Sequence, residues 1–495
     1  MNTPIVDISG DVSRQTVIAA GTADLYQGHP TTVLTRTGKL ICVWTTGHGG
    51  PCGPAAESHD GGRTWTRIDG RFPAVYAETH ANCPTLQKMS LPDGRERLLV
   101  FSAKRSLRNP ANGFCPLGIV WSDDDGASWR EAPPANLSSA MPPTGFMPLA
   151  DGSVALFGQV RHNPMVATDR PADDQDVWMA ISVDGLSWSV PRIVASSPEK
   201  NLCEPFAIRS PNGREIALLL RENRHAGCSM MCFSRDEGAT WTAPVDTAPE
   251  LTGDRHEGVV LPDGRYFIAF RDRMIGSTTY GQYVAWVGTW DDLRNARPGQ
   301  CRVHLVKGWA GLLDADGNPC GGVVGDTGYS GVELLPSGEL LCTTYVKYWP
   351  DARQQSVVCT RLNAYRAASG ICVMRNLAQS PPIHLLSRTS RQTLSRLPAS
   401  PSAWISSWCR SQPRGFSSEA RKRRIMNNHS LCRGSHKCCQ LYHAATKAAS
   451  CRTANTLHRP FRNNRLREPR MAWPSATCIS RGTCQATRSY SSSRS

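Results

Sequence analysis

Short apolar segments alternate with turn residues along the first 362 residues of the chain. Six times an apolar segment leads into a glycine-containing turn, and a second apolar segment follows. The turns are Thr37-Gly38, Asp93-Gly94, Asp151-Gly152, Asn212-Gly213, Asp263-Gly264 and Ser337-Gly338. Asp-Gly and Asn-Gly between apolar segments are strong hairpin signals. Because no segment keeps a 3.6-residue period, the pattern predicts strands and no long helix.

A second repeat is interleaved with the hairpins. The pattern Ser-x-Asp-x-Gly-x-Thr/Ser-Trp occupies 58–65, 122–129 and 234–241, and a copy shorter by one residue occupies 182–188. The copies start 64, 60 and 52 residues apart, which indicates a repeat architecture. Asp accepts backbone N–H groups, Gly takes the positive φ and Trp packs over the corner, so each copy predicts a structural turn. The motif resembles the Asp-box of sialidase-like β-propellers.

Six hairpin units predict an all-β, six-bladed β-propeller over residues 1–362. About 60 residues per unit are enough for a four-stranded blade with its loops. The Asp-box has decayed at 286–293 in the fifth unit, and only a final strand, 356–362, is recognisable in the sixth. A ring needs closing by a strand from the other end of the chain, and we expect residues 16–20 to supply it.

The composition changes abruptly after this region. Residues 363–495 hold 23 basic residues and two acidic ones, which predicts a disordered tail or the product of a shifted reading frame. A genuine basic tail for nucleic acid or an anionic membrane, using residues 421–424, is the alternative. A metal-binding site in the tail is a further alternative, although the spacing of its residues is unlike that of established sites. Its residues would be Cys432, His436, Cys438, Cys439 and His443.

The propeller region has different chemistry from the tail. Its 33 basic and 39 acidic residues leave no basic surface for nucleic acid. The start of the chain has no charged segment followed by an apolar one, so we expect no signal peptide, and no apolar stretch is long enough to span a membrane. Its 11 cysteines lack paired spacing, which favours free thiols and a cytoplasmic location.

Aligning the six units by their turns superposes two sets of residues. The first set, before the first strand of each unit, is His29, Cys83, Gly145, Glu204, His256 and Tyr329. The second set follows the second strand and is His48, Lys104, Arg105, Arg161, His162, Arg221, Arg271, Arg273 and Lys347. Equivalent positions form rings around a propeller axis, and so many cations predict a carboxylate ligand held by guanidinium groups. Structural ion pairs with Glu204, Glu222, Asp272 or Glu333 are the alternative.

Two segments resemble the catalytic segments of sialidases. Residues 328–338 are similar to the segment with the nucleophilic tyrosine, and residues 203–221 to the segment with its glutamate partner and a carboxylate-binding arginine. The resemblance implies that Tyr329 is the nucleophile, Glu204 its general base and Arg221 a carboxylate ligand. A sialic acid carries a carboxylate on its anomeric carbon, so a neutral tyrosine avoids the repulsion that an acidic nucleophile would meet.

The chain also departs from the sialidase pattern. His29 stands where sialidases have the arginine of an Arg-Ile-Pro motif, and the loop 46–53 lacks the expected acid/base aspartate. His48 is the titratable residue of that loop and the candidate general acid. Arg271 is the candidate for the third arginine. Arg161, His29 and His256 complete the expected substrate-binding residues.

Three functions fit these observations. The first is a sialidase-like glycoside hydrolase that removes a terminal acidic or other exposed sugar. The alternatives are a non-catalytic carbohydrate-binding propeller and an interaction scaffold or inactive gene product. The histidines His29, His48, His80 and His256 raise the further hypothesis of a transition-metal site, but we expect no metal and no cofactor.

Overall fold

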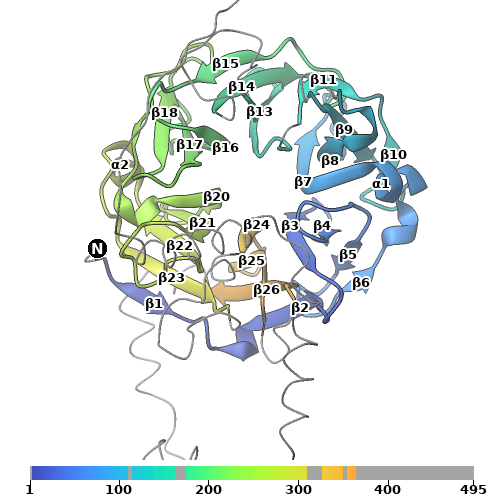
Figure 1. The fold of residues 1–495 in the computed structure, drawn as a ribbon, viewed down its shortest axis with the longest axis horizontal. Coiled ribbons are helices and arrows are strands. Elements are labelled where there is room, and N and C mark those ends of the chain that lie inside the picture. The colour runs from blue at the N-terminus through green and yellow to red at the C-terminus, as the bar shows by residue number, and fades with distance from the viewer. Residues whose placement is uncertain are drawn as a thin grey trace, which may run out of the picture. The chain divides into compact units, whose positions relative to one another are not determined.

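The computed structural model describes residues 3–109, 114–139, 141–161, 174–308, 326–348 and 354–363. Within these ranges six sheets are arranged in a ring around a central axis, as Figure 1 shows. The predicted all-β, six-bladed β-propeller is therefore confirmed. Apart from Asn363, which ends the last strand, the predicted tail 363–495 with its Cys and His cluster lies outside the described residues.

Each blade has four strands in order from the axis outward, and two of the blades have one further strand. The innermost strands are β3 (Gln27–Leu34), β7 (His80–Ser90), β12 (Gly145–Pro148), β16 (Leu202–Arg209), β20 (Gly253–Val260) and β24 (Gly328–Leu334). The second strands are β4 (Leu40–Thr46), β8 (Glu96–Lys104), β13 (Val154–Arg161), β17 (Ile216–Glu222), β21 (Tyr266–Asp272) and β25 (Glu339–Val346). The third strands are β5 (Ala55–Ser58), β9 (Pro116–Ser122), β14 (Gln175–Ser182), β18 (Met230–Ser234), β22 (Tyr283–Gly288) and β26 (Ser356–Asn363). The outermost strands are β6 (Thr66–Arg67), β10 (Arg130–Glu131), β15 (Arg192–Ala195), β19 (Val245–Asp246), β23 (Cys301–Val306) and β2 (Gln15–Ala19).

The predicted hairpins join the first and second strands of every blade. All six predicted turn glycines have a positive φ, which only glycine adopts without strain. They are Gly38, Gly94, Gly152, Gly213, Gly264 and Gly338, with φ values from 74° to 88°.

The first Asp-box forms the turn between β5 and β6. Ser58 Oγ donates to Asp60 at 2.8 Å and accepts from the Gly62 N–H at 2.9 Å, while the Thr64 N–H donates to Asp60 at 2.9 Å. The copies at 122–129, 182–188 and 234–241 have equivalent bonds. In the fifth blade the short helix α2 (Trp290–Arg294) occupies this turn.

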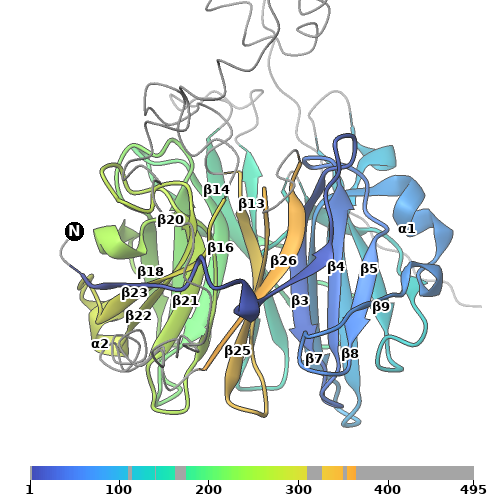
Figure 2. The ribbon, with the colours of Figure 1, turned by 90° about the horizontal axis from the view of Figure 1, so that it is seen from below.

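Two strands from the N-terminal segment close the ring. β2 pairs antiparallel with β26 and completes the sixth blade, as expected for residues 16–20. β1 (Ile5–Asp7) pairs parallel with β23 as a fifth strand of the fifth blade, which the sequence analysis did not foresee. Figure 2 shows this segment running from β23 across to β26.

The core consists of apolar clusters between neighbouring blades. The cluster between the fifth and sixth blades joins Phe267 and Tyr283 to Leu340 and Val358, for example. Five further interfaces follow the same arrangement around the ring. Each blade therefore stabilises its neighbours, and the loops at the end of the central channel are free to carry chemistry.

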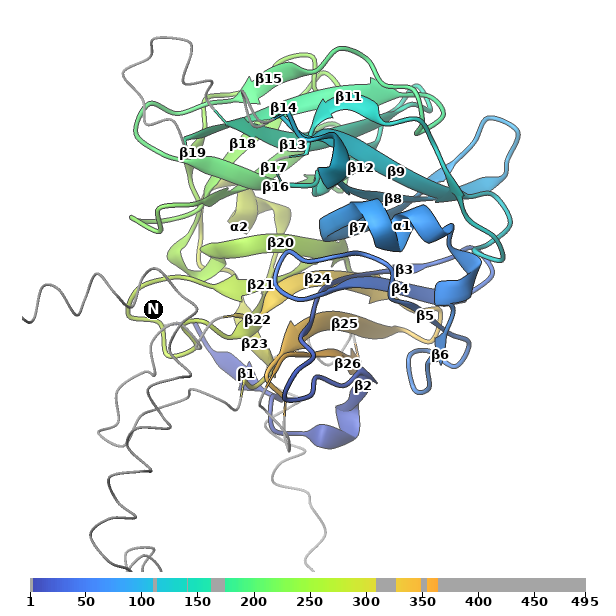
Figure 3. The ribbon, with the colours of Figure 1, turned by 45° about the vertical axis from the view of Figure 1, so that its right-hand side comes forward.

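Helices are a minor part of the fold. The six-residue helix α1 (Ala74–Thr79) lies between the first two blades (Figure 3), and the only other α-helix in the described ranges, α2, has five residues. Neither is long enough to cross a membrane. A further short strand, β11 (Ala135–Ser138), pairs with β9, and the ten described cysteines are all free.

Candidate active site

Five of the six innermost strands have a bulge near their start. The pairing register shifts between Gly28 and Thr31 in β3, and at equivalent places in β7, β16, β20 and β24. A bulge redirects side chains away from the regular alternation of a strand. Each of these bulges has a residue with a left-handed backbone, and these are His29, Cys83, Glu204, Arg255 and Tyr329, with φ values from 43° to 54°. Asn82, next to Cys83, also has a positive φ, of 67°. Such a conformation costs non-glycine residues energy and is concentrated at functional sites.

The bulges bring the side chains of the other four residues together around Tyr329. The His29 ring lies 4.9 Å from the Tyr329 ring, and the Arg255 guanidinium lies 5.1 Å from its centroid. Cys83 packs in the same apolar cluster, and Glu204 accepts a hydrogen bond from the phenol. Residues from five blades therefore meet at one point.

Tyr329 and Glu204 form the buried centre of this site. The phenol Oη donates to Glu204 Oε1, and the two residues are 5% and 1% exposed. Burial raises the pKa of Tyr329 well above its usual value, and the charge of Glu204 adds to this effect. The tyrosine is therefore a neutral phenol with a carboxylate in place to accept its proton.

Arg221 connects this pair to a buried carboxylate. Its Nη1 lies 2.9 Å from Glu204 Oε1, and its Nε lies 2.9 Å from Asp254 Oδ1. Asp254 also contacts Arg271 at 2.8 Å and Arg273 at 3.2 Å, and it is fully buried. Burial alone would raise the pKa of Asp254, but Arg221 and Arg271 hold it well below its usual range. One aspartate thus orients three arginines.

A second acidic group lies beside His48. Asp326 Oδ1 is 3.4 Å from His48 Nδ1 and accepts a hydrogen bond from Tyr345 at 3.0 Å, and its other oxygen accepts from Tyr26 at 3.1 Å. Although burial favours the neutral acid, the hydrogen bond and charge of His48, with Arg271, lower the pKa of Asp326 to about 2. The carboxylate is therefore ionised at working pH and can orient the imidazole.

His29 links the two halves of the site. Its ring lies 4.8 Å from the His48 ring and 4.9 Å from the Tyr329 ring, and its Nδ1 is 3.1 Å from the Thr45 hydroxyl. Burial, together with His48, lowers its pKa to about 3, so the imidazole is neutral. His29 therefore packs against the nucleophile candidate without adding charge.

The structure brings most of the predicted site residues together, but not all of them. Tyr329, Glu204, His48, Arg221, Arg271 and His29 belong to one connected cluster. His256 is turned away from it, and its Nε2 lies 2.9 Å from the Leu251 carbonyl oxygen. Arg161 is at the exposed end of β13, beside residues that are not described.

The four histidines considered for a metal do not converge. His80 pairs with Ser102 and with Glu131, at 2.7 Å and 3.1 Å, away from His29. In the described ranges no three His, Cys, Asp or Glu side chains are placed to hold a metal ion. Lys104 of the second predicted ring also pairs with Glu131.

Three important residues were missed from the sequence. Asp254 and Arg255 stand just before His256, and the alignment by turns was one residue out of register at this bulge. Asp326 precedes Gly328, and its place beside His48 depends on the meeting of the first and sixth blades. A search for acidic residues a few positions before each left-handed bulge residue could have found both aspartates, since Asp254 precedes Arg255 and Asp326 precedes Tyr329.

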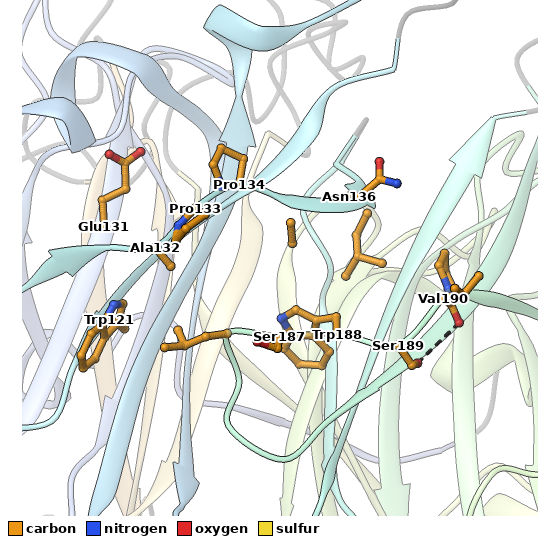
Figure 4. A pocket seen from close by; sticks show the side chains of 14 residues that line it. Trp121, Glu131, Ala132, Pro133, Pro134, Asn136, Ser187, Trp188, Ser189 and Val190 are labelled. Atoms are coloured by element: carbon orange, nitrogen blue, oxygen red, sulfur yellow. Dashed lines mark hydrogen bonds between the residues drawn. The ribbon is translucent and has the colours of Figure 1, made fainter. Parts of the chain in front are cut away.

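A separate groove of about 610 Å³ lies between the outer parts of the second and third blades. Figure 4 shows Trp121 and Trp188 with Pro133 and Pro134 along it. It shares no residue with the cluster around Tyr329.

Comparison with known proteins agrees with this architecture. The BNR repeat-like domain matches residues 118–274. A structure of a protein of unknown function from Dyadobacter fermentans is similar, with a TM-score of 0.53 and 16% identity over 71% of this chain and 98% of that one. No curated protein matches the chain significantly.

Two glycoside hydrolases are also among the similar structures. A mutant alpha-L-arabinofuranosidase from Fusarium graminearum has a TM-score of 0.50 and 12% identity over 71% of this chain and 98% of that one. The NanB sialidase from Streptococcus pneumoniae has a TM-score of 0.46 and 12% identity over 71% and 70%. At these identities the matches show the fold alone. The BNR repeat-like match and the ring of six sheets agree on a propeller built from repeats.

Proposed function

We propose that the protein is a glycoside hydrolase that removes a terminal sugar, with Tyr329 as nucleophile and Glu204 as its general base. The hydrogen bond from the Tyr329 phenol to Glu204 is the observation that carries the proposal. A nucleophile beside a base that is itself oriented by a third group is the usual arrangement for covalent catalysis, and Arg221 is that third group.

The reaction has two balanced steps. In the first, Tyr329 Oη bonds to the anomeric carbon as the bond to the leaving oxygen breaks; the phenol proton passes to Glu204, and His48 protonates the leaving oxygen. In the second, a water oxygen replaces Tyr329 on the sugar. The water gives a proton to His48, and Glu204 returns its proton to the phenol. The contact between Asp326 and His48 supports this role because a carboxylate stabilises an imidazolium.

The charge of the site supports an acidic sugar. The site contains four guanidinium groups, from Arg221, Arg255, Arg271 and Arg273, and three carboxylates, from Glu204, Asp254 and Asp326. Asp254 contacts Arg221 through its Nε, and Glu204 contacts Arg221 through its Nη1, which leaves Nη2 of Arg221 outside these two ion pairs. An excess of positive charge in a partly buried site favours an anionic ligand.

A neutral sugar is the second candidate, and Asp254 is the observation that favours it. This buried carboxylate already contacts three of the four guanidinium groups, so it offsets much of the charge that a substrate carboxylate would meet. An alpha-L-arabinofuranosidase has the same fold. Both candidates use the Tyr329–Glu204 pair and differ only in the sugar.

Release of 4-methylumbelliferone from a panel of acidic and neutral sugar conjugates tests the proposal. We expect hydrolysis of at least one conjugate and a loss of at least about 100-fold in kcat for Tyr329→Phe, with Tyr348→Phe as the matched control. Tyr348 donates to Gln15 at 2.8 Å and is not part of the site. Glycan binding without hydrolysis would instead support the carbohydrate-binding alternative, and full activity of Tyr329→Phe would exclude the mechanism.

A further inference from the structure

Arg255 is the least expected residue of the site. It is 1% exposed, and it is one of the largest fully buried side chains in the described ranges. It stands at the bulge of the fifth blade with a φ of 53°, equivalent to Tyr329 in the sixth and Glu204 in the fourth. The same type of bulge that places the candidate nucleophile and its base in the site therefore also places this arginine there.

The guanidinium of Arg255 lies over the face of the Tyr329 ring. Its Cζ is 5.1 Å from the ring centroid, within the range of cation–π attraction. The attraction is strongest where both groups are removed from water, as they are here. When a phenol loses its proton, the negative charge spreads into the ring, so a cation over the ring face gains further attraction.

Direct ion pairs do not neutralise Arg255. Its Nη2 donates to the Thr85 hydroxyl at 3.0 Å, whereas its Nε and Nη1 have no hydrogen-bond partner among the described residues. Burial raises the pKa of the nearby Glu257 to about 8, so this acid is mostly uncharged at neutral pH. Arg221 and Arg271, in contrast, are paired with carboxylates. The charge of Arg255 is therefore available to the ring of Tyr329.

We propose that Arg255 is a positioning residue for the nucleophile: its guanidinium stabilises the phenolate that Tyr329 forms as its proton passes to Glu204. The inference rests on the proposed role of Tyr329 and adds a residue that acts on the tyrosine through the face of its ring. The Tyr329 Oη–H bond breaks, the proton moves to Glu204 Oε1, and the electron pair stays on the phenolate under the guanidinium.

Other groups also face Tyr329 and set the background for its ionisation. They come from several blades and are His29, Cys83, Glu204, Arg221, Arg271 and Tyr345. A variant of Arg255 leaves all of these in place, so its effect on the tyrosine can be separated from theirs.

The test follows the ionisation of 2,3,5,6-tetrafluorotyrosine at position 329 by ¹⁹F NMR as a function of pH. Its fluorines lower the pKa of the phenol by several units, which offsets the rise caused by burial, and they report the charge of the ring directly. We expect Arg255→Gln to raise the titration midpoint by about one to two pH units, and Arg255→Lys to raise it less because its charge is kept but displaced. The matched control is Arg302→Lys, another fully buried arginine, which lies over Phe270 at 5.6 Å and pairs with Asp272.

An unchanged midpoint in Arg255→Gln would overturn the proposal and leave Arg255 as a space-filling residue. If Arg255→Gln does not fold, the Arg255→Met midpoint decides, because this variant also removes the charge and an unchanged midpoint there contradicts the proposal equally. The titration needs no substrate, so a protein that hydrolyses no conjugate can still show the shift. Failure of the proposed function and failure of this inference are therefore distinguishable.

Discussion

The pair formed by His48 and Asp326 makes a prediction at the scale of single residues. If His48 protonates the leaving oxygen, His48→Gln should slow glycosides with sugar leaving groups by about 10²–10⁴-fold in kcat/KM. Aryl glycosides, whose leaving groups need little protonation, should lose much less. Comparing the two substrate types measures the difference.

A matched histidine controls for a general effect of the substitution. The His59 and His48 side chains are both 69% exposed, and His59 lies 3.4 Å from Glu57 in the first Asp-box, outside the site. His59→Gln should therefore leave kcat/KM unchanged for both substrate types. Equal losses on both substrate types in His48→Gln would contradict the role of general acid.

Residues of the site differ in how far the sequence predicts them. Tyr329, Glu204 and Arg221 stand in segments with a recognisable pattern, and the structure places them in contact. Asp254 and Asp326 belong to no local pattern because their partners come from other blades. Contacts between distant parts of the chain are set by the closing of the ring, which a local pattern does not describe.

At the scale of elements, the Asp-box glycines connect neighbouring blades. A Cβ on Gly62 would lie 2.2 Å from Leu341 of the sixth blade, and its φ is 82°. Gly62→Ala should therefore lower the free energy of unfolding by clearly more than about 1 kcal/mol, since a strained backbone and a clash add. Urea unfolding followed by fluorescence measures the change.

A hairpin glycine separates the two contributions. Gly94 has nearly the same φ, 83°, but a Cβ there would meet no atom within 4 Å. Gly94→Ala should thus lower the free energy of unfolding only by the cost of the strained backbone, about 1 kcal/mol. Equal losses in the two variants would show that the contact between the Asp-box and the next blade contributes nothing to stability.

The elements themselves were largely predictable. Each hairpin turn has its own Asp-Gly, Asn-Gly or similar pair, and this local chemistry determines the turn wherever it occurs. Position 255 was misassigned because a bulge adds a residue without changing the apolar pattern around it. Helix α2 was not foreseen either, although Thr289 and Asp292 form a capping box at its start.

The closing of the ring makes a prediction for the whole molecule. β2 completes the sixth blade, whereas β1 is an additional strand on the already four-stranded fifth blade. A chain starting at Gly21 should lose cooperative unfolding or aggregate because it exposes the edge of β26. A chain starting at Val12 should keep a cooperative thermal transition. Equal behaviour of the two truncations would contradict this account of closure.

The central claim is that Tyr329 attacks the sugar. The most direct measurement is mass spectrometry of the protein after reaction with a slow fluorinated glycosyl fluoride of a sugar that the panel identifies, because such a substrate accumulates the covalent intermediate. We predict a single glycosyl group on the peptide that contains Tyr329, and none in Tyr329→Phe. A glycosyl group on Glu204, or hydrolysis of the same sugar by Tyr329→Phe at the parent rate, would contradict the account.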